Sequence, residues 1–423
     1  MRAVKVEEEV PVLGEFDVVV AGGGPAGFAA GVAAAREGAR TLIVERFNCL
    51  GGMGTAGLVL PFMATAGTEG GVFRELLRRM EELGGAKGLS FDPEAFKFVA
   101  QEMALEEGCE LLFHTFVERA HVEGGIVKGV FVVNKAGRGL ILAKVVVDAT
   151  GDGDVAASAG APFEKGDPKD GRLQPLTLRM RFLGVDREKE GGADLGPVKE
   201  RWEGFKRESG IPYWQGLDRG LDGLHEGEVY LNPDMVEADG TDPWELTRAE
   251  VDGRRKAWAI WRFMRENVPG WEGAWLVDTA IVIGVRETRR ILGEYVLTGD
   301  DVRSARKFPD GIAKASFFID IHGPEMALNF GEWLKRNRVP EGDWYEIPYR
   351  CLVPRGVDNL LVAGRCISSD REAQGSLRIM PTCMAIGEAA GTAAAICVKR
   401  NVKPRELDGK ELRGLLKERG ADI

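Results

Sequence analysis

Three glycines near the N-terminus have the spacing of a phosphate-binding turn. Gly22, Gly24 and Gly27 follow the apolar run FDVVVA and open a stretch of small helix formers, PAGFAAGVAAARE. In such a turn the first glycine allows the tight bend, the second lets a pyrophosphate approach backbone N–H groups, and the third lets helix and strand pack closely. Glu45 ends the next apolar run, where its carboxylate can accept both ribose hydroxyls. These residues predict a site for the ADP half of a dinucleotide.

A second glycine-rich stretch, LGGMGT at Leu50–Thr55, follows the acid by a few residues. It would let the chain run close along a ligand longer than ADP, and an NAD site does not need such a stretch at this position. The stretch therefore predicts FAD as the cofactor. Consecutive glycines can also form a flexible loop without a ligand, and that alternative stays open at this point.

A third glycine-rich segment, DATGDGD at Asp148–Asp154, matches a second nucleotide fingerprint through Gly151, Gly153 and Ala156. The sequence after it, GAPFEKGDPKDGRLQP, contains no second strand that ends in an acid at the right distance. A separate NAD(P)H domain is therefore not expected. We expect this segment to end a strand and return the chain beside the FAD.

The segment Ile379–Cys383 (IMPTC) precedes a helical pattern that runs from Pro381 to about Lys399. Pro381 fits the first helical position, so free backbone N–H groups and the positive end of the helix dipole lie there. If that end faces the flavin, it would stabilise negative charge on N1 and O2 of the reduced ring. An ordinary buried helix start is the alternative.

Several stretches resemble the FAD-dependent oxidoreductase family of the glutathione-reductase-like superfamily, the flavoproteins with two dinucleotide-binding domains. Besides GGGPAG and LGGMGT, they are IGVRETRRILGEYVLTGDD at 283–301, FFIDIHGP, and the C-terminal stretch that begins YEIPYRCLVPRGVDNLLVAGR. The resemblance covers nearly the whole chain and is weakest between about residues 185 and 245. It implies non-covalent FAD on a two-domain fold, with Gly364 and Arg365 near the ribityl chain or pyrophosphate and residues 379–383 near the isoalloxazine ring. No pair of cysteines follows Gly52, so a dithiol reductase is not expected.

The motifs and the resemblance together give one set of predicted cofactor-binding residues. They are Gly22, Gly24, Pro25, Ala26, Gly27, Glu45, Arg46, Gly51, Gly52, Met53, Gly54, Thr55, Val117, Thr150, Gly151, Gly364, Arg365, Ile379, Met380, Thr382 and Cys383.

His322 and Arg286 are the predicted catalytic residues. In SFFIDIHG, strand alternation would place Asp320 and His322 on one face, where an acid and an imidazole could orient and deprotonate a substrate hydroxyl. Arg286 and Arg290 would share one face of a helix and could clamp a carboxylate or phosphate. A strand-end hydrogen bond for His322 and a solvated helix face for the arginines are the alternatives. Arg371 and Arg378 are comparable candidates.

The elements that position these residues indicate an α/β fold. A Rossmann-like FAD-binding domain, with a parallel sheet and a β-meander between 110 and 149, is expected at 14–160 and 344–400. An inserted α+β substrate or cap domain is expected at 161–343, and a helical tail at 401–423. Asp92 is expected to cap a helix that begins at Pro93.

Composition restricts the partners. The chain has 423 residues and a net charge of -10, which disfavours nucleic acid and anionic membranes as partners. The N-terminus has no apolar core typical of a signal peptide, and no stretch reaches about 18 uninterrupted apolar residues, so a cytoplasmic location is expected. The six cysteines form no CxxC pair, and no metal site is predicted. Abundant Glu, Lys and Arg with scarce Asn and Gln are typical of thermophilic proteins.

The predicted function is transfer of a hydride between a small organic substrate and flavin N5. One alternative is reduction of a C=C bond, as in fumarate-reductase-like proteins. Another is a nucleic-acid-modifying flavoprotein that resembles the tRNA-uridine-modifying family in its opening motif. A third is an electron-transfer subunit without a substrate of its own. The electron acceptor or donor is left open, as is the oligomeric state, for which a homo-oligomer is one option.

Overall fold

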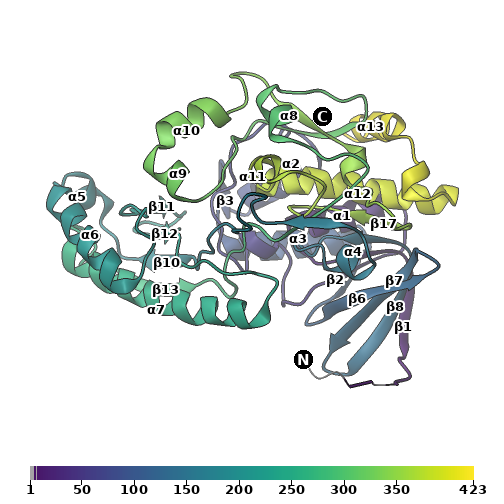
Figure 1. Cartoon of the computed structure of the whole chain (residues 1–423), viewed down its shortest axis with the longest axis horizontal. Coiled ribbons are helices and arrows are strands. Elements are labelled where there is room, and N and C mark those ends of the chain that lie inside the picture. Colours follow the sequence, from purple (N-terminus) through teal and green to yellow (C-terminus); the bar gives the residue numbers. More distant parts are fainter. Residues whose placement is uncertain (1–3, 6) are drawn as a thin grey trace.

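The computed structural model describes residues 4–5 and 7–423, and its larger lobe is built on a seven-stranded sheet (Figure 1). Five strands run parallel in the order β5-β2-β1-β8-β17, and β7 and β6 continue from β8 as an antiparallel meander. The bounds are β1 (Val12–Ala21), β2 (Thr41–Val44), β5 (Glu110–Leu112), β6 (Phe116–Glu123), β7 (Ile126–Asn134), β8 (Gly137–Asp148) and β17 (Leu360–Val362). The expected α/β class, with its parallel sheet and meander, is confirmed.

The register of the parallel strands brings their carboxyl ends to one edge. Ala21 at the end of β1 lies opposite both Val44 of β2 and Asp148 of β8. Val362 at the end of β17 also lies opposite Asp148. Ligands in open α/β sheets bind outside the carboxyl ends of the strands. The loops that follow these four strands therefore meet at the place where a dinucleotide would be expected.

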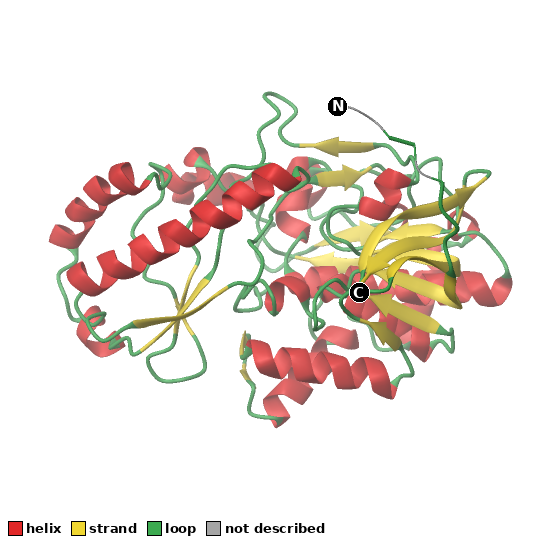
Figure 2. Ribbon diagram, turned by 90° about the horizontal axis from the view of Figure 1, so that it is seen from below, coloured by secondary structure: helices red, strands yellow, loops and turns green. Residues whose placement is uncertain are grey.

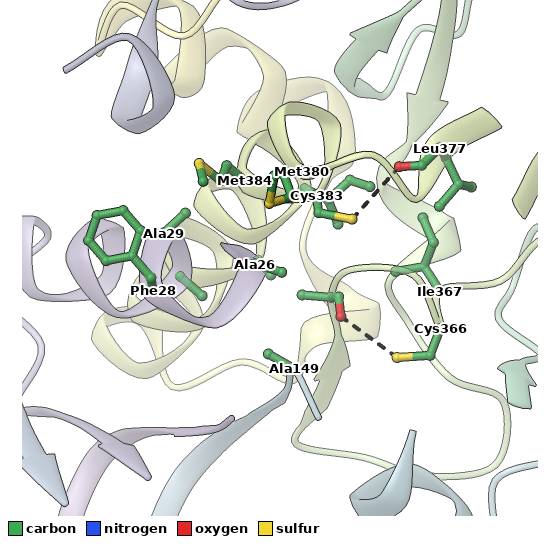
Figure 3. Packing of buried hydrophobic residues seen from close by; sticks show 14 of the residues in the cluster. Ala26, Phe28, Ala29, Ala149, Cys366, Ile367, Leu377, Met380, Cys383 and Met384 are labelled. Atoms are coloured by element: carbon green, nitrogen blue, oxygen red, sulfur yellow. Dashed lines mark hydrogen bonds between the residues drawn. The ribbon is translucent and has the colours of Figure 1, made fainter. Parts of the chain in front are cut away.

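Two helices cover the sheet and contact each other closely, namely α1 (Pro25–Arg36) and α12 (Met380–Arg400). A Cβ atom on Gly387 or on Gly391 of α12 would lie 2.0 Å from a carbonyl oxygen of α1, so only glycine allows this spacing. Figure 3 shows Ala26 and Ala29 of α1 beside the first turn of α12. By length and composition α12 could cross a membrane, but 83% of its apolar window is buried inside the fold, as in a core helix.

The segment between β2 and β5 supplies two further helices to this lobe, α2 (Gly71–Glu82) and α3 (Pro93–Glu106), joined by the hairpin of β3 (Ala86–Lys87) and β4 (Ser90–Phe91). The predicted start of α3 is confirmed, because the Asp92 side chain accepts a hydrogen bond from Glu94 N at 2.8 Å. This capping, with Pro93 in the first turn, fixes where the helix begins.

A smaller lobe lies apart from the main sheet in both views (Figures 1 and 2). Its antiparallel sheet has the order β11-β12-β10-β13, and the long helix α7 contacts β13. The bounds are β10 (Met180–Leu183), α5 (Arg187–Gly191), α6 (Gly196–Ser209), β11 (Leu221–Asp222), β12 (Val229–Leu231), α7 (Pro243–Asn267) and β13 (Trp275–Thr279).

The chain after β13 returns to the larger lobe well before residue 343. Strand β15 (Gly311–Ala315) pairs with β16 (Tyr345–Pro348) and packs against α12 and α13 (Gly409–Glu418). Of the region 161–343, only about residues 180–279 therefore form the separate sheet. The remaining elements are α4 (Asp154–Ser158), β9 (Phe163–Lys165), β14 (Arg289–Ile291), α8 (Gly299–Arg303), α9 (Pro324–Leu328), α10 (Phe330–Asn337), α11 (Arg371–Leu377) and the short 3₁₀ turns η1 (Gly52–Gly54), η2 (Tyr349–Cys351) and η3 (Pro404–Glu406).

Two local predictions are wrong. The predicted helix around Arg286 and Arg290 does not form: residues 284–288 are extended or bent, and β14 pairs with β9. The preceding run IVIGV is β-branched, and Gly284 bridges to Thr177, so sheet-like pairing outweighs helix propensity there. The segment 316–322, which contains His322, is not a strand either, because within the described residues no neighbouring strand pairs with it through backbone hydrogen bonds.

Candidate functional site

The three glycines of the first turn occupy positions that only glycine can fill, or that a ligand requires. Gly22 has φ +96°, and a Cβ there would lie 2.6 Å from the carbonyl oxygen of Ala149. A Cβ on Gly27 would lie 1.8 Å from the Gly22 oxygen, so the helix could not pack on the turn. A Cβ on Gly24 would meet nothing within 4 Å, so it faces open space at the N-terminus of α1. Backbone N–H groups and the helix dipole are thus presented to an anion at this point.

Glu45 anchors the turn from the next strand. Its carboxylate is 5% exposed and accepts hydrogen bonds from Gly23 N at 2.7 Å and from Phe47 N at 2.8 Å. A carboxylate offers about four acceptor positions, so about two remain for ribose hydroxyls. Glu45 therefore fixes the shape of the turn and can also accept hydrogen bonds from the ribose hydroxyls.

A cavity extends from this turn to the start of α12. Fifteen of the predicted cofactor-binding residues line it: Gly22, Gly24, Pro25, Ala26, Glu45, Arg46, Gly52, Met53, Val117, Thr150, Gly151, Gly364, Arg365, Met380 and Cys383. They come from the loops after all four strand ends and from the first turn of α12, except Val117, which lies in β6. The cavity therefore continues well beyond the part that an ADP moiety would fill.

Six predicted residues do not line this cavity: Gly27, Gly51, Gly54, Thr55, Ile379 and Thr382. Gly27, Gly51, Gly54 and Thr55 contact other parts of the protein, whereas Oγ1 of Thr382 is buried without a hydrogen-bond partner. Thr55 donates from Oγ1 to the Leu50 carbonyl at 2.8 Å, and a Cβ on Gly54 would lie 2.6 Å from the Phe96 ring. Gly51, Gly54 and Thr55 shape the loop after β2, while Gly52, whose Cβ would lie 2.8 Å from the Gly24 Cα, brings that loop onto the phosphate turn.

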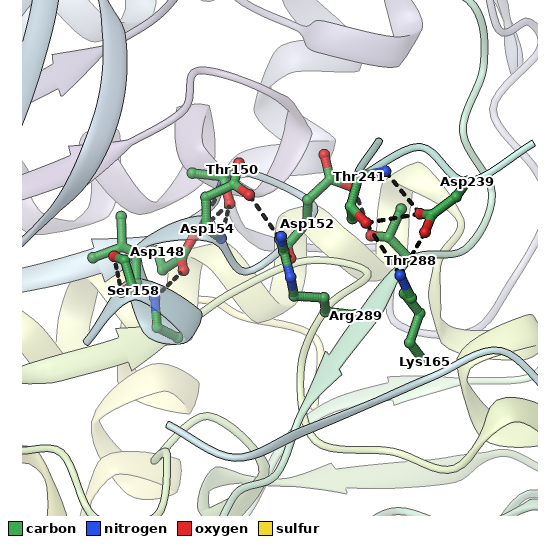
Figure 4. A network of polar contacts seen from close by, with 12 residues as sticks. Asp148, Thr150, Asp152, Asp154, Ser158, Lys165, Asp239, Thr241, Thr288 and Arg289 are labelled. Carbon is green, nitrogen blue, oxygen red and sulfur yellow. Dashed lines mark hydrogen bonds and ion pairs between the residues drawn. The ribbon is translucent and has the colours of Figure 1, made fainter. Parts of the chain in front are cut away.

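The segment Asp148–Asp154 connects the cofactor cavity to the extended chain that precedes β14. Asp148 accepts from Thr150 and from Ala156 N, which closes the loop into the short helix α4 (Figure 4). Asp152 accepts from Thr288 Oγ1 at 2.6 Å and pairs with Arg365 at 2.9 Å. No second dinucleotide unit is built here in the described chain, since α4 has five residues and β9 pairs antiparallel with β14.

His322 belongs to a second cavity, of about 770 Å³, which Trp214, Ile321 and Arg371 also line. Nδ1 of His322 lies 2.8 Å from Oδ1 of Asp234, and its Nε2 lies 3.4 Å from Oδ1 of Asp320. The predicted proximity of Asp320 and His322 is therefore found, although a loop and not a strand provides it.

A polar chain links the two cavities. Arg378, which lines the cofactor cavity, donates to Oδ2 of Asp320 at 2.7 Å, and Asp320 faces His322 in the second cavity. Arg286 lies 3.3 Å from Oδ1 of Asp234, on the other side of the histidine. Arg286 lines neither cavity and is 8% exposed, so its contact with a ligand is not direct in this arrangement.

The open face at Gly24, the carboxylate of Glu45 and the cavity that runs on to residues at the start of α12 fit an FAD molecule, with the N-termini of α1 and α12 available to its negatively charged groups. The family model described as FAD dependent oxidoreductase matches residues 17–416. The chain belongs to this family. Its cofactor is FAD, and it is an oxidoreductase.

Other proteins resemble this FAD dependent oxidoreductase over part of its chain or at low sequence identity. Thiamine thiazole synthase from Methanococcus aeolicus is 35% identical over 157 residues, which are 34% of this chain. The chain spans 58% of the length of that relative. A geranylgeranyl bacteriochlorophyll reductase-like protein from Thermoplasma acidophilum is 15% identical, with a TM-score of 0.48 over 96% of this chain and 84% of its own. The anhydrotetracycline hydroxylase from Streptomyces rimosus is 14% identical, with a TM-score of 0.46 over 96% and 65%.

The buried Asp234 and the half-buried Asp320 of this flavoprotein stay ionised. Burial raises the pKa of Asp234, but the charge of Arg286 and the hydrogen bond from His322 outweigh it and hold the pKa below its usual value. Burial also raises the pKa of Asp320, and the charges of His322 and Arg378 outweigh that effect and lower the pKa strongly. The site therefore keeps two negative charges beside the histidine at neutral pH.

Several residues of the site have no signal in the sequence. Asp234 lies in an irregular stretch, LNPDMVEAD, where nothing distinguishes it from other loop acids.

Arg371, which the sequence analysis named as a candidate substrate clamp, is already held by hydrogen bonds to Glu287 and Asp167. Val282, Ile283 and Val285 line the cofactor cavity from the segment after β13, and only the register of that segment with residues 177–179 places them there.

Proposed function

We propose that this protein transfers a hydride between a small organic substrate and FAD, oxidising a C–H bond next to a hydroxyl, amine or acid group. Bound FAD supplies the hydride acceptor at N5 of its ring. The protein contributes the position of the substrate and a group that handles its proton. The observation that carries the proposal is the chain His322–Asp320–Arg378, which joins the second cavity to the cofactor cavity.

His322 is the residue that we propose for proton transfer. It lines the second cavity and is 19% exposed, so a hydroxyl or amine that enters the cavity can reach its ring. When the ring is neutral and Nδ1 donates to Asp234, Nε2 is free to accept the substrate's proton. Asp320, at 3.4 Å from Nε2, then stabilises the protonated ring. Arg286 positions this group through Asp234.

The test is the variant His322→Gln. After an anaerobic screen has found a compound that bleaches the flavin band near ~450 nm, the variant should remain yellow and folded but should bleach at least about 100-fold more slowly, as expected for the loss of a general base. His225→Gln, at an exposed histidine, is the matched control and should bleach like the parent protein. Unchanged bleaching in His322→Gln would contradict the assignment.

The same geometry favours a second candidate, the reduction of a C=C bond. Both ring nitrogens of His322 face carboxylates, and such a ring satisfies both contacts only when each nitrogen carries a proton. A protonated histidine is a proton donor, which reduction of a double bond requires. A flavin midpoint potential below that of the candidate alkene couple, together with reoxidation of the two-electron reduced protein by that alkene, would favour this direction. Bleaching by an alcohol or amine would favour oxidation.

The partners and location remain proposals of the same kind. We propose a small-molecule substrate, a separate electron acceptor or donor and a cytoplasmic location, without nucleic acid or membrane. The net charge of -10 supports the exclusion of nucleic acid. Salt-sensitive binding of tRNA would instead support the tRNA-modifying alternative, and a failure of the isolated chain to turn over any substrate would support an electron-transfer subunit. Light scattering would decide whether the protein is a homo-oligomer.

A further inference from the structure

An exposed stripe of alternating apolar and basic side chains runs along the long helix α7 of the smaller lobe (Figure 1). Its members recur at steps of four and three residues, so they lie within one narrow arc of the helix. The stripe consists of Trp244, Arg248, Val251, Arg255, Trp258 and Arg262, and all six are exposed. The opposite face of α7 is buried, with Ala257, Ile260 and Met264 among its residues. The described fold therefore leaves the stripe uncovered.

The stripe is more apolar than an ordinary solvated helix face. Trp244 is 75% exposed, Trp258 is 49% exposed and Val251 is 45% exposed. Part of the stripe forms an open groove of about 580 Å³, which three arginines line and no acidic residue does. Tryptophan and arginine are enriched in protein–protein interfaces, and they are the residues that most often dominate binding there. The composition of the stripe is therefore that of a protein interface.

The arginines of the stripe are poorly neutralised within the chain. Arg248 contacts Glu245 at 3.7 Å, a long and exposed pair on the same helix, and such pairs contribute little. Within the described residues no carboxylate forms an ion pair with Arg255 or Arg262. The stripe therefore presents guanidinium groups next to indole rings on one surface. Cation–π contacts are made between these two kinds of group.

The spacing of the stripe is that of a heptad seam, with an apolar residue at every d position and arginine at every a position. In a parallel pair of such helices each arginine would face the same arginine of the partner, and like charges repel. In an antiparallel pair, position a of one helix faces position d of the other. Every arginine then faces tryptophan or valine, so the pattern is complementary to itself only in the antiparallel arrangement.

We infer that the stripe on α7 is the interface of a homodimer, in which the two helices pack antiparallel across a two-fold axis at the level of Gly253. In this register Trp244 faces the partner's Arg262, and Arg248 faces the partner's Trp258. Val251 then faces the partner's Arg255 beside the axis. Because the axis is two-fold, each of these layers occurs twice, and the closed dimer leaves no part of the stripe exposed.

The interface would support the cofactor site from outside. Leu246, in the first turn of α7, lines the cofactor cavity, while Trp244 lies on the outer face of the same turn. In the dimer this turn lies between the cavity and the C-terminal half of the partner's helix. Each copy therefore backs one wall of the other copy's cofactor cavity.

An anionic membrane is the other surface that tryptophan and arginine could bind. A helix that lies on a membrane keeps its basic residues on the polar face, apart from the apolar face that enters the lipid. Here arginine and tryptophan alternate along one stripe, so lipid would have to take up both together. The alternation favours a second copy of this chain.

The first test is size-exclusion chromatography with light scattering on the FAD-loaded full chain, which should be a dimer. Trp258→Arg sets arginine against Arg248 in two layers, so this variant should be a monomer where the parent protein is a dimer. Leu221→Arg, at a residue of β11 that is 46% exposed, is the matched control and should stay dimeric. A parent protein that is monomeric up to about 100 μM, or a dimeric Trp258→Arg, overturns the inference.

The second test exchanges the two members of one layer. Arg248→Trp combined with Trp258→Arg should restore the dimer that Trp258→Arg alone loses, because each arginine again faces tryptophan. A parallel pair would gain nothing, since arginine would still face arginine. Flavin content and circular dichroism check the fold, and Trp244→Arg, which opposes the partner's Arg262, replaces Trp258→Arg if that variant does not fold. A double variant that stays monomeric overturns the antiparallel interface.

The third test addresses the membrane. The parent protein is sedimented with vesicles of phosphatidylglycerol and phosphatidylcholine, and it should stay in the supernatant. Salt-sensitive sedimentation with the vesicles that Trp258→Arg abolishes would show that the stripe binds anionic lipid, and it would overturn the inference.

Discussion

Nδ1 of His322 lies 2.8 Å from Oδ1 of Asp234, a residue 88 positions earlier in the chain. The same carboxylate faces Arg286 at 3.3 Å and accepts from Trp214 Nε1 at 3.3 Å. Asp234 is therefore the shared partner of both residues that sequence reasoning selected as catalytic. The fold of the smaller lobe, and not proximity in sequence, connects them.

The first prediction concerns this shared carboxylate. Asp234→Asn leaves the buried Arg286 without its counterion, so the free energy of unfolding should fall by about 3–5 kcal/mol. Adding Arg286→Met removes the unpaired charge and should restore part of that loss. Urea unfolding of the parent, the single and the double variants measures both effects. A double variant that is no more stable than Asp234→Asn would contradict the pairing.

The second prediction separates two glycines of the same motif. Gly27→Ala places a Cβ 1.8 Å from the Gly22 oxygen, so it should destabilise the fold and abolish FAD binding together. Gly24→Ala meets no protein atom within 4 Å, so the apoprotein should unfold at the same temperature while FAD is retained poorly. Thermal unfolding of the apoprotein and the flavin content after gel filtration measure the two effects. Equal loss of apoprotein stability in both variants would show that Gly24 does not face a ligand.

The third prediction concerns pH. Burial raises the pKa of Asp148 from 3.8 to about 6, against the hydrogen bonds that it accepts from Ala156 and Thr150. Because the folded pKa lies above the unfolded value, the contribution of Asp148 is fully present below about pH 4. It is lost as pH rises through about 6, and it amounts to about 3 kcal/mol at 1.36 kcal/mol per pKa unit.

Urea unfolding from about pH 4 to about pH 7 checks this contribution. The difference in unfolding free energy between the parent protein and Asp148→Asn should shrink across that range, in favour of the variant at higher pH. Asp300→Asn, at a side chain that is 94% exposed, is the control. A difference that stays constant with pH would exclude the raised pKa.

The fourth prediction concerns the cysteines. All six lie within the described residues, are buried and form no disulfide. Burial raises the pKa of Cys383, which lines the cofactor cavity, to about 12, so its thiol stays protonated and unreactive at neutral pH. Cys383→Ala should keep its flavin and its rate of bleaching, and iodoacetamide should not label the native protein. Rapid labelling at Cys383 with loss of flavin reduction would instead indicate thiol chemistry.

The cofactor half of the site could be predicted from the sequence because its signals are local. Gly22, Gly24 and Gly27 act within one turn, and Glu45 follows on the adjacent strand, so spacing alone specifies their geometry. The predicted residues that do not line the cavity, such as Gly54 and Thr55, fall in the same local stretch. There the sequence cannot distinguish a glycine that admits a ligand from one that admits Phe96.

The substrate half could not be predicted in the same way. The pattern around Arg286 favoured a helix, and pairing with residues brought from elsewhere in the chain overrode that preference. The sequence by itself determined the nucleotide turn, the β-meander and the α/β class, since these depend on short-range periodicity and on glycine geometry. Only the tertiary structure decided that Asp234, His322, Asp320 and Arg378 form one network, because burial and charge pairing are set by contacts between distant segments.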